Sequence, residues 1–271
     1  MNIATRPPRS FLFLPATRLE RLDKALTSGA DAVIIDLEDA VAPADKAAAR
    51  AALANAAAPM ASAAPGTLWL RINAMDTREA SADLDLWQAL PAPGIVLPKT
   101  QRLDELRALP PGCPVLALIE SAQGLAMAPR LGEVPAVVSL AFGSIDYALD
   151  LGGIDPDDRE ALRHARSTLV WAARVAGLPA PVDGVTARLD DDAALLADAG
   201  EARRLGFGAK LCIHPRQVAT VNAVFAPSAA DIEWARRVVA AAGDGAATQL
   251  DGAMIDRPVL QRAQRVLAAA R

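Results

Sequence analysis

The chain has 271 residues, 52% of them apolar, and a formal net charge of −4, with a pI of about 5.3. This acidic balance argues against an unspecific binder of nucleic acid or anionic membranes, and no apolar run reaches the roughly 20 residues that span a bilayer. The length is close to the roughly 250 residues of a single barrel domain. We therefore predict no nucleic-acid partner and no membrane partner.

Short apolar runs recur along the chain, and most of them end in a polar or charged residue. Continuous rather than alternating apolar character is typical of parallel strands that are buried on both faces. The sequence predicts strands at Phe11–Pro15, Ala32–Glu38, Leu68–Asn73, Gly94–Lys99, Pro114–Glu120, Val137–Gly143, Pro179–Asp183 and Lys210–Pro215.

Helix-forming composition fills most of the intervals between these strands. The first predicted helix has Thr17 as its N-cap and Glu20 three residues later, which is a capping box, and Gly29 ends it. The predicted helices are Arg18–Ser28, Ala44–Ala57, Asp83–Leu90, Leu103–Ala108, Ala122–Leu131, Asp157–Ala176 and Asp190–Leu205.

Eight strand–helix units predict an α/β fold, a (β/α)8 TIM barrel over residues 1–215, with its active face at the C-terminal ends of the strands. Residues 216–271 exceed what a barrel needs. They predict a C-terminal helical extension, with helices at Gln217–Phe225, from Ser228 and from about Pro258, and a glycine-rich break at Gly243–Gly245. We expect this extension to pack on the barrel or on a neighbouring subunit.

Carboxylates gather at the end of the second predicted strand. Alternation along the strand places Asp36 and Glu38 on one side and Leu37 on the other. Two carboxylates at a barrel mouth are costly unless cations or the water shell of a metal accompany them. Helix capping by Asp39 and salt bridges made by the other two are the structural alternative.

The next two predicted strands each contain one basic residue, and the second of these strands ends at Lys99. Arg71 lies in an otherwise apolar strand, and because a guanidinium keeps its proton it needs anionic partners there. A substrate carboxylate or a thioester oxygen would serve, as would a structural salt bridge with Glu38 or Glu120. Lys99 has three open roles: a Schiff-base lysine, a phosphate ligand or an ion-pair partner, with covalent catalysis the least supported.

Acidic residues also follow the fifth and sixth predicted strands. Glu120 ends the fifth, and Asp146 comes shortly after the sixth. Consecutive strands share one part of the barrel mouth, so the two carboxylates are expected there together. Two carboxylates without a histidine or thiolate cluster favour a hard, oxygen-loving ion such as Mg²⁺. Helix capping by these residues is the alternative.

The remaining candidates carry weaker signals. Cys113 and Cys212 each lie in or beside a buried strand, which favours small core residues in a reducing cytoplasm over a disulfide or a nucleophile. His214 is open to a hydrogen-bonding or an acid–base role, and His164 is expected to be structural. No GxGxxG, GxxxxGK[ST], HExxH or paired CxxC motif occurs.

Together these residues resemble the HpcH/HpaI aldolase–citrate lyase family, and within it the citrate lyase β-subunit-like proteins, over nearly the whole chain. The segments that carry the resemblance are Arg9–Pro15, Gly29–Val41, Leu70–Asn73, Gly94–Lys99, Leu118–Gly124, Ala141–Asp146, Gly208–Pro215 and Leu250–Asp256. The resemblance implies a Mg²⁺-dependent lyase or synthase that breaks or makes a C–C bond between an acyl-CoA thioester and a 2-oxo acid.

The resemblance also implies roles for individual residues. It places the metal ligands at Glu120 and Asp146, with substrate contacts at Glu120, and the substrate-binding arginine at Arg71. It places an aromatic contact at Phe13 and an acid–base residue at Asp256, which enters the site of a neighbouring subunit. Independently of the resemblance, we expect Asp36 and Glu38 to orient Arg71 and metal-bound water. Basic residues expected to face CoA are Arg18, Arg21 and Lys24. The family further implies a homotrimer or hexamer.

The chain departs from its relatives at two positions near the expected CoA site. Ala16 follows Pro15 where relatives have glycine, and Glu20 stands where some relatives are basic. These departures concern the placement of CoA, and three alternatives to the CoA lyase also stay open. They are an aldolase of free 2-oxo acids, a non-autonomous subunit of a citrate lyase complex, and a CoA thioesterase that uses the same site.

Overall fold

The computed structural model describes residues 7–61, 63–64, 66–91, 93–242, 248–250 and 252–270. The chain divides into two compact units, Met1–Asn222 and Ala223–Arg271. The predicted break at Gly243–Gly245 lies outside the described residues. No helix in the described ranges is both long enough and apolar enough to cross a bilayer.

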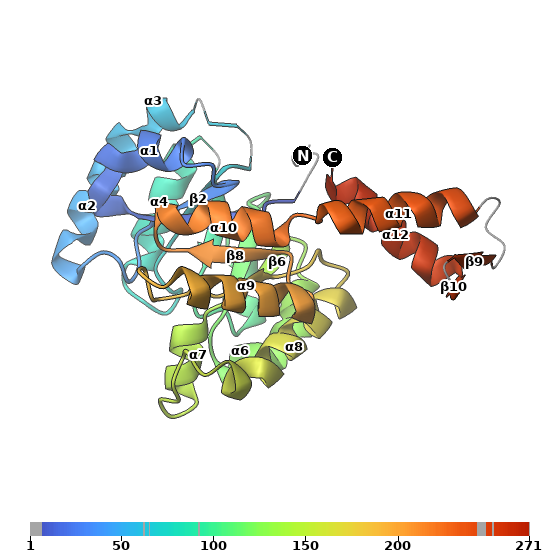
Figure 1. The fold of residues 1–271 in the computed structure, drawn as a ribbon. Helices are drawn as coiled ribbons and strands as arrows, with labels where there is room; N and C mark the ends of the chain where they lie inside the picture. Colours follow the sequence, from blue (N-terminus) through green and yellow to red (C-terminus); the bar gives the residue numbers. More distant parts are fainter. Residues whose placement is uncertain are drawn as a thin grey trace. The chain divides into compact units, whose positions relative to one another are not determined.

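The first unit is a closed barrel of eight parallel strands in the order β1 to β8, with β1 also paired to β8 (Figure 1). The TIM-barrel prediction is confirmed, and every predicted strand is present, although most end one to three residues earlier. The strands are β1 (Ser10–Pro15), β2 (Ala32–Asp36), β3 (Leu68–Arg71), β4 (Gly94–Leu97), β5 (Val115–Ile119), β6 (Val137–Phe142), β7 (Val182–Asp183) and β8 (Ala209–Cys212).

Helices surround this barrel, as the sequence predicts, and two short ones were not expected, at 57–60 and at 144–150. The helices of the first unit, with the one that leads out of it, are η1 (Ala16–Arg21), α1 (Leu22–Leu26), η2 (Pro43–Asp45), α2 (Lys46–Asn55), α3 (Ala57–Met60), α4 (Ala80–Ala89), α5 (Leu103–Arg107), α6 (Ala122–Gly132), α7 (Ser144–Asp150), α8 (Arg159–Val175), α9 (Asp192–Leu205) and α10 (Pro215–Phe225).

The predicted capping box at Thr17 is wrong. The segment after β1 begins as the 3-10 helix η1, which has no side-chain cap hydrogen bond and has a kink at Arg18. A capping box requires the Glu20 carboxylate to turn back toward the Thr17 backbone. That carboxylate instead accepts a hydrogen bond from Arg18 Nε at 2.7 Å, so it is not available for the cap.

The interior of the barrel is filled by residues that alternate along the strands. One buried cluster contains Phe11, Ala32, Ile34, Trp69, Val96, Leu116, Leu118, Ala141, Val182, Ala209 and Leu211, with Phe13 packed against it. Continuing the same alternation by one step places Asp36, Arg71 and Glu120 on the inward-facing side at the C-terminal ends of their strands. The packed interior thus ends in a polar layer, which lies where barrel enzymes carry their active sites.

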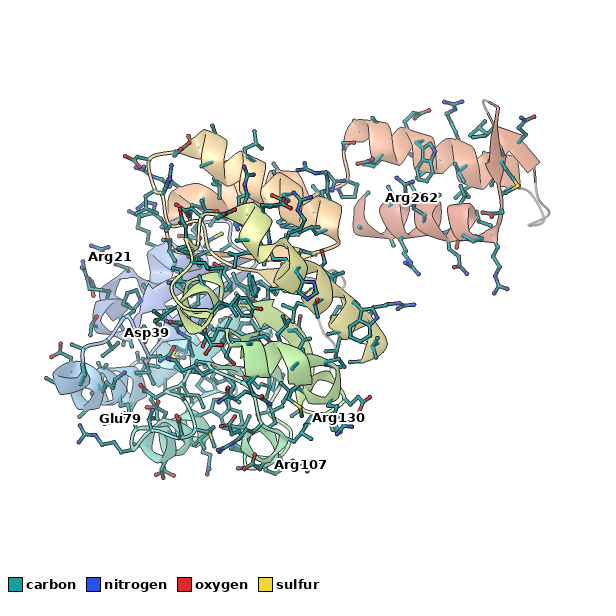
Figure 2. The ribbon with its side chains drawn as sticks, turned by 90° about the horizontal axis from the view of Figure 1, so that it is seen from below. Arg21, Asp39, Glu79, Arg107, Arg130 and Arg262 are labelled. Atoms are coloured by element: carbon teal, nitrogen blue, oxygen red, sulfur yellow. The ribbon has the colours of Figure 1, made fainter. Side chains whose placement is uncertain are left out.

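The second unit is small and has its own core. It contains α11 (Ala229–Ala242), β9 (Thr248–Leu250), β10 (Ala253–Ile255) and α12 (Arg257–Ala270). The two helices pack against each other, and Ala235, Val238, Ile255 and Ala263 are buried among them. Arg262, labelled in Figure 2, lies over the Trp234 ring at 4.6 Å. Both helices were predicted from the sequence, but the paired strands β9 and β10 were not.

Candidate active site

The polar layer is built around an ion pair between β2 and β3. The two strands are paired so that Asp36 lies beside Arg71. Arg71 donates from Nε and Nη2 to the two carboxylate oxygens of Asp36, at 2.7 and 2.6 Å. Its guanidinium also lies 4.8 Å from the centre of the Phe13 ring. This bidentate pairing and the aromatic face fix the guanidinium in one orientation at the barrel mouth.

Glu38 joins this ion pair from the turn after β2. Its backbone N–H donates to Asp36 at 2.8 Å, which holds the turn closed. Its side chain is only 6% exposed, and its Oε2 lies 3.0 Å from Arg71 Nη1. That oxygen is nevertheless buried without a hydrogen-bond donor. Burial raises the pKa of Glu38, and the nearby cations Arg71 and Lys99 only partly oppose this.

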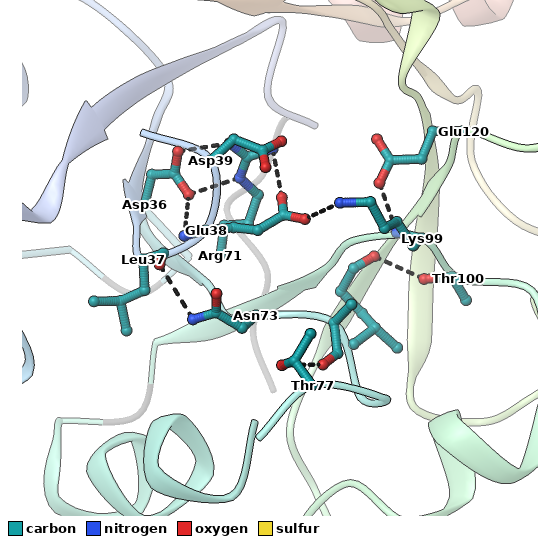
Figure 3. A network of polar contacts seen from close by, with 12 residues as sticks. Asp36, Leu37, Glu38, Asp39, Arg71, Asn73, Thr77, Lys99, Thr100 and Glu120 are labelled. Atoms are coloured by element: carbon teal, nitrogen blue, oxygen red, sulfur yellow. Dashed lines mark hydrogen bonds and ion pairs between the residues drawn. The ribbon is translucent and has the colours of Figure 1, made fainter. Parts of the chain in front are cut away.

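Lys99, just beyond β4, connects Glu38 with Glu120 (Figure 3). Its ammonium donates to Glu38 Oε1 at 2.5 Å, and its backbone N–H donates to Glu120 Oε1 at 2.6 Å. Burial alone would lower the pKa of Lys99, but the hydrogen bond to Glu38 and the surrounding carboxylates outweigh it and raise the pKa. The ammonium therefore stays charged at neutral pH. Lys99 is an ion-pair partner, and its environment is the opposite of what a Schiff-base lysine needs.

Glu120 and Asp146 come close enough to affect each other electrostatically. Glu120 is 4% exposed, and burial, followed by the negative charges of Glu38 and Asp146, raises its pKa well above the usual value. Asp146 lies in the first turn of α7. Gly143 makes room for Glu120, because a Cβ at this glycine would lie 2.5 Å from the Glu120 Cβ. These observations agree with a shared carboxylate site at this part of the mouth.

A second layer of contacts holds the β2 and β3 ends in place. The buried Lys46 ammonium donates to the carbonyl oxygens of Leu37 and Glu38 and to Asn73 Oδ1, at 2.7, 2.9 and 2.6 Å. Asn73 in turn donates to Asp83. Lys46 and Asp83 were not predicted as site residues, because a lysine at the start of one helix and an aspartate inside another carry no local signal of these contacts.

Some predicted candidates lie elsewhere. Arg21, labelled in Figure 2, is an exposed residue of η1, and Lys24 is exposed on α1. Asp256 belongs to the second unit, where its Oδ1 accepts a hydrogen bond from Val259 N–H at 3.1 Å and caps the start of α12. His214 accepts a hydrogen bond from a neighbouring backbone N–H.

The two cysteines are buried, whereas His164 is exposed. Cys113 and Cys212 are buried and free, as predicted. Burial raises the pKa of the Cys212 thiol to about 12, so it is a poor nucleophile. His164 lies exposed on α8, and its structural role stays a prediction.

A further buried ion network was not predicted. Arg166 on α8 pairs bidentately with Asp183 of β7, at 3.0 and 2.9 Å. The fully buried Lys210 of β8 contacts both Asp183 and Asp198. Asp183 and Lys210 alternate with the interior residues Val182, Ala209 and Leu211, so they point toward the helices. This network joins the barrel strands to the surrounding helices and lies outside the barrel mouth. A cavity of about 190 Å³ lies beside it.

The barrel mouth thus contains an oriented guanidinium, the buried carboxylates of Asp36, Glu38 and Glu120, and a charged lysine. A family model described as HpcH/HpaI aldolase/citrate lyase matches residues 9–215. The chain belongs to this family. The matched residues span the whole barrel, and they include every mouth residue described above.

Curated relatives match over nearly the whole chain. A (3S)-malyl-CoA thioesterase from Cereibacter sphaeroides is 36% identical over 97% of this chain and 95% of its own length. A citrate lyase subunit beta-like protein from Mycobacterium tuberculosis is 36% identical over 100% of this chain and 98% of its own.

Solved structures agree with these relatives. CitE from Mycobacterium tuberculosis in complex with magnesium, acetoacetate and coenzyme A superposes with a TM-score of 0.87 at 34% identity, and the match covers 98% of this chain and 99% of that chain. Citrate lyase beta subunit from the same organism, complexed with oxaloacetate and magnesium, gives a TM-score of 0.75 at 34% identity over 83% and 100% of the two chains.

Proposed function

We propose that this protein is a Mg²⁺-dependent carbon–carbon lyase or synthase that acts on a CoA thioester of the malyl-, citramalyl- or citryl-CoA type. Cleavage gives acetyl-CoA and a 2-oxo acid. The observation that carries the proposal is the buried Glu120, whose carboxylate lies at the barrel mouth beside the charge of Asp146. Magnesium, CoA and small oxo acids in the complexes of the related structures support the same chemistry.

The carboxylates at the mouth fit a magnesium ion. In the part of the chain that the structure describes, no group of three or more His, Cys, Asp or Glu side chains is arranged around one metal position. Mg²⁺ commonly takes only one or two protein carboxylates and completes its shell with water and substrate oxygens. Glu120 and Asp146 would hold it, and when bound it would polarise substrate oxygens as a Lewis acid.

Arg71 would bind the substrate and offer positive charge to the oxygens that become negative during the reaction. Asp36 holds the guanidinium at both Nε and Nη2, so Nη1, which lies 3.0 Å from Glu38 Oε2, is the nitrogen that would share its hydrogens with a ligand. A well-placed donor of this kind contributes about 3–4 kcal/mol to transition-state stabilisation. Glu38 would position Arg71 and nearby water, and Phe13 would contact the substrate beneath the guanidinium.

Asp256 would supply the acid–base step. In cleavage it would protonate the methylene carbon of the departing enolate, and in condensation it would remove the α-proton. We propose that residues 216–271 pack on the barrel or on a neighbouring subunit of a homotrimer or hexamer, and that this packing brings Asp256 to a mouth. The capping bond at Oδ1 leaves the carboxylate's second oxygen able to exchange a proton.

The CoA portion would contact the segment after β1. Arg18, Arg21 and Lys24 are the basic residues there, but Glu20 lies 2.7 Å from Arg18 Nε and 3.7 Å from Arg21 Nε. These side chains are largely exposed, so the ion pairs are weak and can give way to a phosphate. The two buried free thiols suit the reducing cytoplasm in which we expect the protein to act.

A second candidate is hydrolysis of the thioester itself. The resemblance to the (3S)-malyl-CoA thioesterase of Cereibacter sphaeroides favours it. The same mouth would bind the substrate, but water would attack the thioester carbonyl, and the products would be free CoA and the intact hydroxy acid.

A product assay separates these functions. The purified chain is incubated with Mg²⁺ and either malyl-, citramalyl- or citryl-CoA or a free hydroxy-oxo acid, and the products are identified by mass spectrometry. The lyase predicts acetyl-CoA with an equimolar 2-oxo acid, and the thioesterase predicts free CoA without one. Cleavage only of free hydroxy-oxo acids would support an aldolase instead. Activity that requires an added partner carrying an acyl-carrier protein would support a non-autonomous subunit.

A further inference from the structure

Lys99 has an unusual backbone. Among the residues that the structure describes, it is the only non-glycine residue with a positive φ, at 49°. This left-handed conformation is unfavourable for any residue with a Cβ, whereas glycine adopts it freely. Residues held in such conformations cluster at functional sites, where surrounding contacts stabilise them.

Two contacts hold Lys99 in this conformation, one at each end of the residue. The side-chain ammonium binds Glu38 at 2.5 Å, and the backbone N–H binds Glu120 at 2.6 Å. Figure 3 shows the lysine reaching from one carboxylate to the other. A rotation of φ to an ordinary negative value would turn the side chain relative to the N–H. Such a rotation would disturb the pair of contacts.

The backbone contact decides which way the Glu120 carboxylate faces. The Lys99 N–H occupies Oε1, and Oε2 lies on the side where Gly143 has no side chain. Buried and fixed in this way, the carboxylate has one oxygen committed to the protein and one left for a ligand.

We propose that Lys99 is a positioning residue whose ion pair with Glu38 stabilises a left-handed backbone that aims its N–H at Glu120 Oε1 and thereby presents Oε2 to a divalent cation. The inference rests on the proposed function, in which Glu120 is a metal ligand. Lys99 acts here through its backbone, and its ammonium serves as the anchor. A residue that acted by charge alone would not need the left-handed conformation.

Three substitutions separate the backbone role from the charge. Lys99→Ala removes the anchor and retains a Cβ, so the backbone relaxes and the N–H leaves Glu120. Lys99→Gly also removes the anchor, but glycine keeps φ near 49° without strain. Lys99→Arg keeps the ion pair and serves as the conservative control. Glu120→Gln is the control for the metal site.

The measurements are the Mg²⁺ dissociation constant by isothermal titration calorimetry and the unfolding temperature without metal. We expect Lys99→Ala to weaken Mg²⁺ binding about tenfold, as the loss of a hydrogen bond to a charged group would. Lys99→Gly and Lys99→Arg should stay within about threefold of the parent, because both keep the backbone conformation. Lys99→Gly should also unfold at a higher temperature than Lys99→Ala, which reverses the usual order of the two residues.

Equal Mg²⁺ affinities of Lys99→Ala and Lys99→Gly, or a higher unfolding temperature for the alanine variant, would overturn the inference. The Glu120→Gln control identifies which claim has failed. If Glu120→Gln binds Mg²⁺ as well as the parent, the proposed metal site is wrong, and the positioning role falls with it. If Glu120→Gln loses binding while the alanine and glycine variants behave alike, only the role of Lys99 is wrong.

Discussion

The bidentate pair of Arg71 and Asp36 allows a quantitative prediction for the substitution Arg71→Lys. The guanidinium donates two hydrogen bonds to Asp36, at 2.7 and 2.6 Å, and its side chain is 11% exposed. A lysine keeps the charge but can replace only one of the two bonds. Since a hydrogen bond to a charged group contributes about 1.5–3 kcal/mol, the variant should lose about 2–3 kcal/mol of folding free energy.

That loss corresponds to a fall in melting temperature of roughly 4–12 °C, at about 2–4 °C per kcal/mol for a domain of this size. If Arg71 also stabilises developing negative charge, kcat should fall by about 100- to 1,000-fold. The assays are urea denaturation followed by circular dichroism, and steady-state kinetics on the CoA thioester that proves to be cleaved.

Arg166→Lys is the matched control. Arg166 makes the same bidentate contact with Asp183, at 3.0 and 2.9 Å, but outside the barrel mouth. Its substitution should lower stability by a similar amount and leave kcat within about threefold of the parent, because it removes no transition-state contact. If both variants lose stability and neither loses kcat, Arg71 has only a structural role. An Arg71→Lys stability loss under about 0.5 kcal/mol would refute the magnitude argued from the two hydrogen bonds.

Three further predictions concern Glu120, Asp256 and Gly143. Burial raises the pKa of Glu120 above its ordinary 4.5. At pH values between 4.5 and this raised pKa, the folded protein holds a proton that the unfolded chain has released, so the free energy of unfolding should fall as pH rises through this range. Glu120→Gln should make this fall with pH shallower. It should also abolish the stabilisation by Mg²⁺ expected in thermal melts of the parent, about 2.7 kcal/mol at 100 times the dissociation constant. An unchanged Mg²⁺ effect would exclude Glu120 as a ligand. Asp256→Ala should abolish turnover, retain Mg²⁺ binding and lower the free energy of unfolding by about 1 kcal/mol, because a helix cap is lost. The control Asp158→Ala, which removes the cap of α8, should lower stability by as much and keep turnover. Mixing inactive Asp256→Ala and Glu120→Gln protomers should restore part of the activity if the aspartate works in a neighbouring subunit, and a mixture that stays inactive would count against that arrangement. Gly143→Ala should lower kcat and Mg²⁺ affinity by displacing Glu120, while Gly200→Ala on α9, whose nearest neighbour is a flexible side chain at 3.6 Å, should change neither.

The strands and the inward-facing mouth residues were predictable from the sequence because both follow from local pattern. Continuous apolar runs identify buried parallel strands. A charged residue at the C-terminal end of such a run is expected at the barrel mouth. Asp36 and Arg71 are clear examples, since their proximity follows from the pairing of neighbouring strands.

Contacts between distant segments were not predictable in the same way. The ion pair of Lys99 with Glu38 joins residues 61 positions apart, and the contact of Lys46 with Asn73 joins residues 27 apart. The partners of these lysines depend on how the loops fold beyond the strand ends, and the hydrophobic periodicity of the sequence does not predict this. The wrong prediction at Thr17 has a similar cause. The Glu20 carboxylate pairs with the Arg18 side chain and not with the Thr17 backbone N–H that a capping box requires.

The binding of one divalent cation by Glu120 and Asp146 is the central claim of this account. The most direct measurement is a crystal structure of the protein grown with Mg²⁺ and oxaloacetate. We expect a single ion at the barrel mouth with one oxygen from each of these two carboxylates, and with the ligand's carboxylate within reach of Arg71. An ion bound elsewhere, or a mouth in which Glu120 and Asp146 contact only protein groups while the ligand is present, would contradict it.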